Sequence, residues 1–211
     1  MNHIKEYRLG REVLRIYVDE NPESQRDWDN LGKIIGWHPR HSIGDDNPFS
    51  TPDDFYAWLK THPSIVLDLY MYDHSGLVFN TSGFSDLWDS MQVGYIFVEL
   101  NRVRSEYRKK RISKKTVEIV RRVLQGEVEV YGQYVNGEVY GFTLEKMSTC
   151  TKCGEPLSEL VDSCWGFYGT VDPVKNGMVE HLPQKWQKFL RAEKAIVACI
   201  CEESGCLTEQ S

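Results

Sequence analysis

One apolar run constrains the fold more than any other feature of the sequence. Residues 65–72 are almost continuously apolar, with Asp68 as the only charged residue. The run is far shorter than the ~20 residues of a membrane span, so it predicts a strand buried on both faces. A turn at 73–76 leads into a second strand at 77–80, and a third buried strand is expected at 94–99.

Helices are expected between and after these strands. One begins after Thr51, a good N-cap, and ends before Pro63. A second begins after Ser113, presents one apolar face, and ends at Gly126, because glycine is favoured just past a helix end. The last helix is expected at roughly 184–198.

Further strand signals lie outside the central segment. Residues 14–18 alternate and predict a strand. The pair Asn136-Gly137 predicts a hairpin between strands at 127–131 and 137–144. A strand at 162–167 should pair with 138–145 after an excursion through 146–161. The predicted fold is therefore α+β, with one mainly antiparallel sheet, flanking helices and a peripheral Cys-containing loop.

Length and composition bound the organisation of the chain. The 211 residues fit one or two domains of ~150 residues. We expect a single α+β domain over 1–198, with 146–161 as a zinc-knuckle-like excursion and 199–211 as a Cys-rich tail. The N-terminus lacks the apolar segment of a signal peptide and no run is long enough to span a membrane. These features predict a soluble, cytoplasmic protein.

The formal charge of −6 is unevenly distributed. Residues 102–122 hold ten bases and two acids and so carry +8, which leaves −14 for the remainder. The basic segment suits contact with phosphates, and the acidic remainder suits contact with a basic nucleic-acid-binding protein. An ordinary solvated surface would show the same pattern. The helix after Ser113 should expose the following bases: Lys114, Lys115, Arg121 and Arg122.

Six cysteines raise the question of a metal site. Cys150 and Cys153, followed by glycine, have the spacing of a knuckle that gives two thiolates to a tetrahedral Zn²⁺. Cys201 and Cys206 are expected to complete a structural zinc site, with Cys199 as a substitute. Free thiols are an alternative, and so are disulfides, although a reducing cytoplasm disfavours them.

The sequence contains no established catalytic motif such as a P-loop, a nucleotide-binding glycine fingerprint or a zinc-protease helix. If the protein is an enzyme, His74 is the candidate base, paired with Asp73, Asp86 or Asp89. Cys164 is then the candidate nucleophile, although a cysteine inside a strand is usually a small buried apolar residue. A histidine in a turn more often forms structural hydrogen bonds, so no catalytic residue is assigned.

Four segments together resemble one family. RDWDNLG (26–32), YDHSG (72–76), WDSMQVGYI (88–96) and DSCWGFYG (162–169) are similar to segments of an uncharacterised family of bacteriophages and mobile elements, mostly of Gram-positive hosts. The resemblance covers roughly residues 10–180. It carries no established chemistry, but it implies a phage accessory protein, and such proteins often antagonise host defence, as anti-CRISPR and anti-restriction proteins do.

Three functions follow from these observations. The first is a phage-encoded inhibitor that binds a host nucleic-acid-targeting effector, most readily a CRISPR-Cas nuclease, in the cytoplasm of the host bacterium. Trp28 and Trp37 would anchor that contact, because tryptophan is enriched among interface hot spots. The second is an enzyme that acts on a nucleotide or nucleic acid through His74 and nearby carboxylates. The third is a nucleic-acid binder that uses the basic segment 102–122.

Overall fold

The chain folds into two compact units. One combines Met1–Pro22 with Gly137–Ser211, and the other is Glu23–Asn136. The computed structural model of the protein describes residues 2–73, 76–84 and 90–203. A single domain over 1–198 was expected from the sequence. The first unit joins the two ends of the chain, and local patterns in a sequence carry no signal for such distant pairing.

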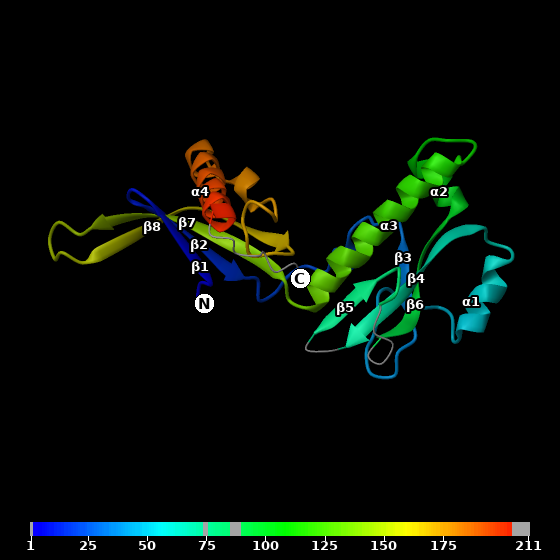
Figure 1. The fold of residues 1–211 in the computed structure, drawn as a ribbon. Coiled ribbons are helices and arrows are strands. Elements are labelled where there is room, and N and C mark those ends of the chain that lie inside the picture. The colour runs from blue at the N-terminus through cyan, green and yellow to red at the C-terminus, as the bar shows by residue number, and fades with distance from the viewer. Residues whose placement is uncertain (1, 74–75, 85–89, 204–211) are drawn as a thin grey trace. The chain divides into compact units, whose positions relative to one another are not determined.

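The first unit is a four-stranded antiparallel sheet covered on one face by a helix (Figure 1). Its strands, in spatial order, are β1 (Lys5–Leu9), β2 (Glu12–Val18), β7 (Val139–Thr149) and β8 (Pro156–Tyr168). A 3-10 turn, η2 (Met178–His181), and helix α4 (Gln184–Glu203) supply the covering side chains. Trp186 of α4 is fully buried and donates its indole N–H to Glu12 at 2.8 Å.

The segment 146–161 is not a loop, as the sequence suggested, but the outer part of a β-hairpin. β7 and β8 stay paired out to Thr149 and Pro156, and the Cys150 N–H donates to the Glu155 carbonyl at 2.8 Å across the tip. Figure 1 shows this hairpin extending past α4. The pairing of 162–167 with 138–145 is confirmed.

The second unit is another four-stranded antiparallel sheet, with helix α3 along one face (Figure 1). Its strands, in spatial order, are β3 (Lys33–Gly36), β6 (Ser90–Glu99), β4 (Ser64–Asp73) and β5 (Leu77–Asn80). The other elements are η1 (Gln25–Asp27), α1 (Pro52–Leu59), α2 (Leu100–Glu106) and α3 (Lys114–Val135).

The apolar run at 65–72 forms the centre of β4, as predicted, but its two faces differ. Ile65, Leu67, Leu69 and Met71 are buried against α3. On the opposite face Val66, Tyr70 and Tyr72 are half-buried and Asp68 is exposed, since α1 covers only part of it. The strand is therefore fully buried on one face only.

Helix α3 is longer than the sequence predicted. Gly126 lies inside it, and residues 127–131, expected as a strand, are helical. Val120, Leu124, Val128 and Tyr131 are all buried on the face toward the sheet, three or four residues apart. The expected hairpin at Asn136-Gly137 is instead the end of this helix, with Gly137 in the left-handed region at φ +69°.

The α+β class is confirmed, with two antiparallel sheets in place of the single one expected. The N-cap at Thr51 is also confirmed, because its hydroxyl accepts the Asp54 N–H while the Asp54 carboxylate accepts the Thr51 N–H. None of the helices in the described part of the chain is long and apolar enough to cross a membrane.

The course of α3 can be tested at Gly126. We expect Gly126→Ala to raise the free energy of unfolding by about 0.5–1 kcal/mol, since alanine is the better residue inside a helix. A Cβ added there meets no atom within 4 Å, so no clash offsets the gain. Urea and thermal denaturation measure the change.

Gly137→Ala is the matched control. Its φ of +69° strains an L-residue, so this variant should be less stable by ~1 kcal/mol or more. If Gly126 ended the helix, Gly126→Ala would be destabilising in the same way.

Candidate functional site

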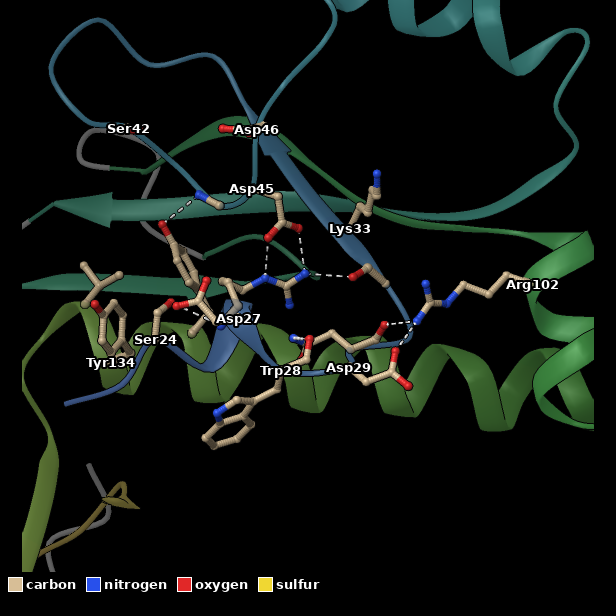
Figure 2. A pocket seen from close by; sticks show the side chains of 16 residues that line it. Ser24, Asp27, Trp28, Asp29, Lys33, Ser42, Asp45, Asp46, Arg102 and Tyr134 are labelled. Carbon is tan, nitrogen blue, oxygen red and sulfur yellow. Dashed lines mark hydrogen bonds and ion pairs between the residues drawn. The ribbon is translucent and has the colours of Figure 1, made fainter. Parts of the chain in front are cut away.

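A cavity of about 670 Å³ opens on the second unit (Figure 2). The elements that surround it are η1 with the residues after it, the segment 42–46, Arg102 of α2 and the last turns of α3. Its charged side chains belong to the following residues: Arg26, Asp27, Asp29, Lys33, Asp45, Asp46 and Arg102. They divide into a buried set on its floor and an exposed set around its rim.

Arg26 is the centre of the floor. Its Nε and Nη2 donate to the two carboxylate oxygens of Asp45 at 2.9 and 2.7 Å, and Nη2 also donates to the Gly32 carbonyl at 2.7 Å. Nη1 lies 3.4 Å from Glu127 Oε2. The Arg26 side chain is only 8% exposed, so its charge is balanced by these partners and little by water.

Glu127 and Asp45 also hold the backbone around Arg26. Glu127 accepts the N–H groups of Leu31 at 2.8 Å and Gly32 at 3.1 Å, and Asp45 accepts that of Ile34 at 2.8 Å. Burial raises the pKa of Glu127, although these N–H groups and Arg26 oppose the shift. Two carboxylates and one guanidinium thus fasten an irregular segment to α3.

The rim has a different character. Trp28 is 48% exposed, and Asp27, Asp29, Asp46 and Lys33 are exposed along the same rim. Arg102 donates to Asp29 at 2.8 Å and to the Asn30 carbonyl at 2.5 Å (Figure 2). The rim thus combines an exposed aromatic side chain with three carboxylates against two cations, Lys33 and Arg102, and this net negative charge suits a basic partner.

Trp37, the second proposed anchor, is not exposed. It is half-buried, packs against the cluster of Phe55 and Tyr95, and donates its indole N–H to the Phe49 carbonyl at 3.0 Å. Its polar atom is therefore already used inside the unit. Of the two proposed aromatic anchors, only Trp28 lies at the surface with a large exposed fraction.

Asp73, one of the catalytic candidates, lies among three cationic or titratable side chains. Arg40 donates to its carboxylate at 3.0 Å, and His41 Nε2 lies 3.6 Å from the same oxygen. The His38 ring stacks on that of His41, and its Nδ1 accepts the N–H groups of Arg40 and His41. Burial and the neighbouring charges lower the pKa of His38.

The other catalytic candidates are not assembled by the described structure. His74, Asp86 and Asp89 lie outside the described residues. Cys164 belongs to the first unit, whereas Asp73 belongs to the second. Cys164 is half-buried against the core of its unit, which fits the expected role of a small apolar residue.

The basic segment forms one exposed surface on α2, α3 and the turn between them. We call it the basic surface and define it by its ten bases: Arg102, Arg104, Arg108, Lys109, Lys110, Arg111, Lys114, Lys115, Arg121 and Arg122. All ten are exposed. The predicted exposure of the four bases on α3 is thus confirmed.

The cysteine knuckle lies at the tip of the β7–β8 hairpin. Hydrogen bonds from the N–H groups of Cys153 and Lys152 hold the pKa of the Cys150 thiol below its usual value. Gly154 at φ +76° donates its N–H to the Cys150 carbonyl at 2.9 Å and closes the turn. Within the described residues no group of three or more metal ligands forms.

Comparison with known proteins identifies no relative of the chain. No protein-family model, curated protein or solved structure matches the chain. Two residues central to the site, Arg26 and Glu127, were not singled out from the sequence, because Glu127 lay in a segment expected to be a strand.

The Arg26 network predicts a large loss of stability when its cation is removed. We expect Arg26→Ala to lower the free energy of unfolding by about 3 kcal/mol, because Asp45 and Glu127 would keep partly buried charges without the cation that balances them. Arg40→Ala is the matched control. Its ion pair with Asp73 is exposed, so its loss should cost less than ~1 kcal/mol. Equal effects of the two variants in urea denaturation would contradict a structural role for the floor.

The zinc site stays a prediction. We expect untagged protein to contain one Zn²⁺ per chain, held by Cys150 and Cys153 and completed by two of Cys199, Cys201 and Cys206. Native mass spectrometry measures the metal content. The side chains of the last three lie outside the described residues.

Serine variants show which thiols take part. Cys150→Ser and Cys153→Ser should lose the metal, and Cys164→Ser should retain it, since that thiol lies against the core of its unit. A metal-free protein whose melting temperature is the same with and without a chelator would contradict the prediction.

Proposed function

We propose that the chain is a phage-encoded anti-defence protein that inhibits a host nucleic-acid-targeting system by stoichiometric protein binding, with a CRISPR-Cas effector as its target. The phage setting comes from the sequence resemblance. The observation that supports binding is the exposed Trp28 at the acidic rim of the cavity.

Trp28 has the features of an interface anchor. Tryptophan contributes strongly to binding when a partner covers it, and a concave surface with a polar rim excludes water from such a contact. At 48% exposure, the side chain presents a large area to a partner while its backbone is held by η1. Asn30 fixes that turn by donating to the carbonyls of Gln25 and Trp28.

The charge around Trp28 defines the partner. Asp27, Asp29 and Asp46 are exposed, and the second unit outside 102–122 carries −10. RNA-guided effectors hold their guide–target duplex in positively charged channels. An acidic surface with an aromatic centre matches such a channel, because complementary potentials guide association.

The floor of the cavity favours binding over turnover. The Arg26 cation and its two partly buried carboxylates are paired with one another and with backbone groups. Groups held in this way have a structural role and are not free to exchange protons with a substrate. The cavity is therefore a concave surface whose floor is held in place by ion pairs and hydrogen bonds.

The enzyme hypothesis keeps one specific observation in its favour. Asp73, at the end of β4, lies 3.6 Å from His41, which gives this strand end a carboxylate–imidazole pair. An enzyme acting on a nucleotide or nucleic acid through His74 and nearby carboxylates would use this strand end.

Titration against a purified effector tests the proposal. Target-DNA cleavage should fall as inhibitor is added, and inhibition should saturate near one chain per effector. Trp28→Ala should weaken binding about 30-fold or more, the effect of losing a hot spot of ~2 kcal/mol. Tyr56→Ala is the matched control, because Tyr56 is 50% exposed in the same unit but does not line the cavity.

Two outcomes would overturn the proposal. Complete inhibition at a small fraction of the effector concentration would show turnover, and loss of that activity in Asp73→Asn would move the site to the end of β4. Equal weakening by Trp28→Ala and Tyr56→Ala would show that the cavity rim is not the contact.

A further inference from the structure

We propose that the basic surface is a second binding site, whose ligand is the phosphate backbone of a nucleic acid. This inference does not depend on the proposed inhibition, since it concerns other side chains and another class of ligand. It starts from the exposed charge of α2, α3 and their connecting turn.

The charge of this surface is almost entirely unpaired. The one ion pair between its bases and a described carboxylate is that of Arg102 with Asp29. Glu106 and Glu118 are the only acids within 102–122. Nine exposed cations thus lack a counter-charge in the described structure, a strong local field for an anion.

Helix α3 arranges four of these cations in two pairs. Lys114 and Lys115 are separated from Arg121 and Arg122 by seven residues, about two helical turns or ~10 Å. Both pairs therefore lie on one face, away from the buried Val120 and Leu124. One strand of a duplex advances ~3.4 Å along the axis per phosphate, so the two pairs can reach separate phosphates of the same strand.

The turn before α3 adds four consecutive bases, Arg108 to Arg111, all exposed. Among the described residues, Arg108 is the one non-glycine residue with a left-handed backbone, at φ +50°. Lys109 is tied to Thr116, with Nζ 3.3 Å from its hydroxyl. The turn thus extends the charge of α3 beyond its first residue.

The composition of the surface favours a nucleic acid over a protein or a membrane. Its one exposed large apolar side chain among the described residues of α2 and α3 is Val123, at 37%. Membrane-binding helices need larger apolar groups, and protein hot spots usually combine Arg with the aromatic side chains of Trp or Tyr. Six arginines and four lysines with almost no apolar area match a contact made through phosphates.

The net charge of −6 does not prevent this contact. At physiological salt the field of an exposed charge decays over ~8 Å, so a phosphate at the basic surface is governed mainly by the nearest cations. Acidic groups elsewhere weaken the approach from a distance. Binding should therefore be local, independent of base sequence and steeply dependent on salt.

Fluorescence anisotropy with the full chain tests the site. The probes are a short labelled DNA duplex of mixed sequence, its single strand and the corresponding RNA, between about 50 and 200 mM salt. The logarithm of the association constant should fall linearly with that of the salt concentration. Arg121→Gln with Arg122→Gln should reduce the slope by up to ~1.8 for the duplex and ~1.4 for the single strand.

Two matched variants distinguish an effect of the basic surface from an effect of the chain's overall charge. Lys175→Gln with Lys188→Gln removes the same charge from exposed positions of the first unit and should leave the slope unchanged. Glu118→Gln removes the acid between the two basic pairs and should strengthen binding. All of these side chains are exposed, and circular dichroism verifies that the variants fold.

Three results would overturn the proposal. The first is the absence of binding to every probe at the lowest salt concentration. The second is an equal loss in the Lys175/Lys188 control. The third is binding of polyglutamate with no binding of any nucleic acid, which would identify an acidic protein as the ligand. Failure of effector inhibition alone leaves these measurements unaffected, so the two proposals fail separately.

Discussion

The Arg26 guanidinium, held between Asp45 and Glu127, is the interaction on which the second unit's surface depends. The segment that carries it has little regular structure, and apolar packing alone would not fix its path. Buried charges require specific partners, so one arrangement of the backbone is selected over others that would leave a charge unpaired. This network fixes the segment that carries Trp28, and the hydrogen bonds of Asn30 and Arg102 complete the placement of the rim.

The same unit separates its charges into two neighbouring surfaces. The rim of the cavity carries three exposed carboxylates against Lys33 and Arg102, the exposed faces of α2 and α3 are basic, and the pair of Asp29 with Arg102 lies where they meet. Opposite fields on one small unit would neutralise each other if the side chains were mixed. Because they are segregated, each surface keeps a potential that an oppositely charged ligand can detect.

Much of the second unit was predictable because its signals are local. The run at 65–72 and the Thr51 cap depend on neighbouring residues, and the strand and the cap both formed as expected, although the strand is fully buried on one face only. The predicted end of α3 was wrong. Gly126 is a residue that often ends helices, and the β-branched residues after it locally favour a strand. The apolar spacing that continues through Val128 and Tyr131 overrides that preference once the helix packs on the sheet.

The features that could not be predicted from the sequence are contacts between residues far apart along the chain. The first unit pairs β2 with β7, and Arg26 meets Glu127 across 101 positions. The ten bases were visible as a composition, but whether carboxylates would neutralise them depended on the fold. Lys114 and Lys115 lie in the first turn of α3, where the helix dipole opposes a cation by ~0.3–1 kcal/mol each. Mutual repulsion among the exposed bases adds to that cost. A polyanion that binds only the folded state would relieve both effects, so the arrangement is more stable with such a ligand than without it.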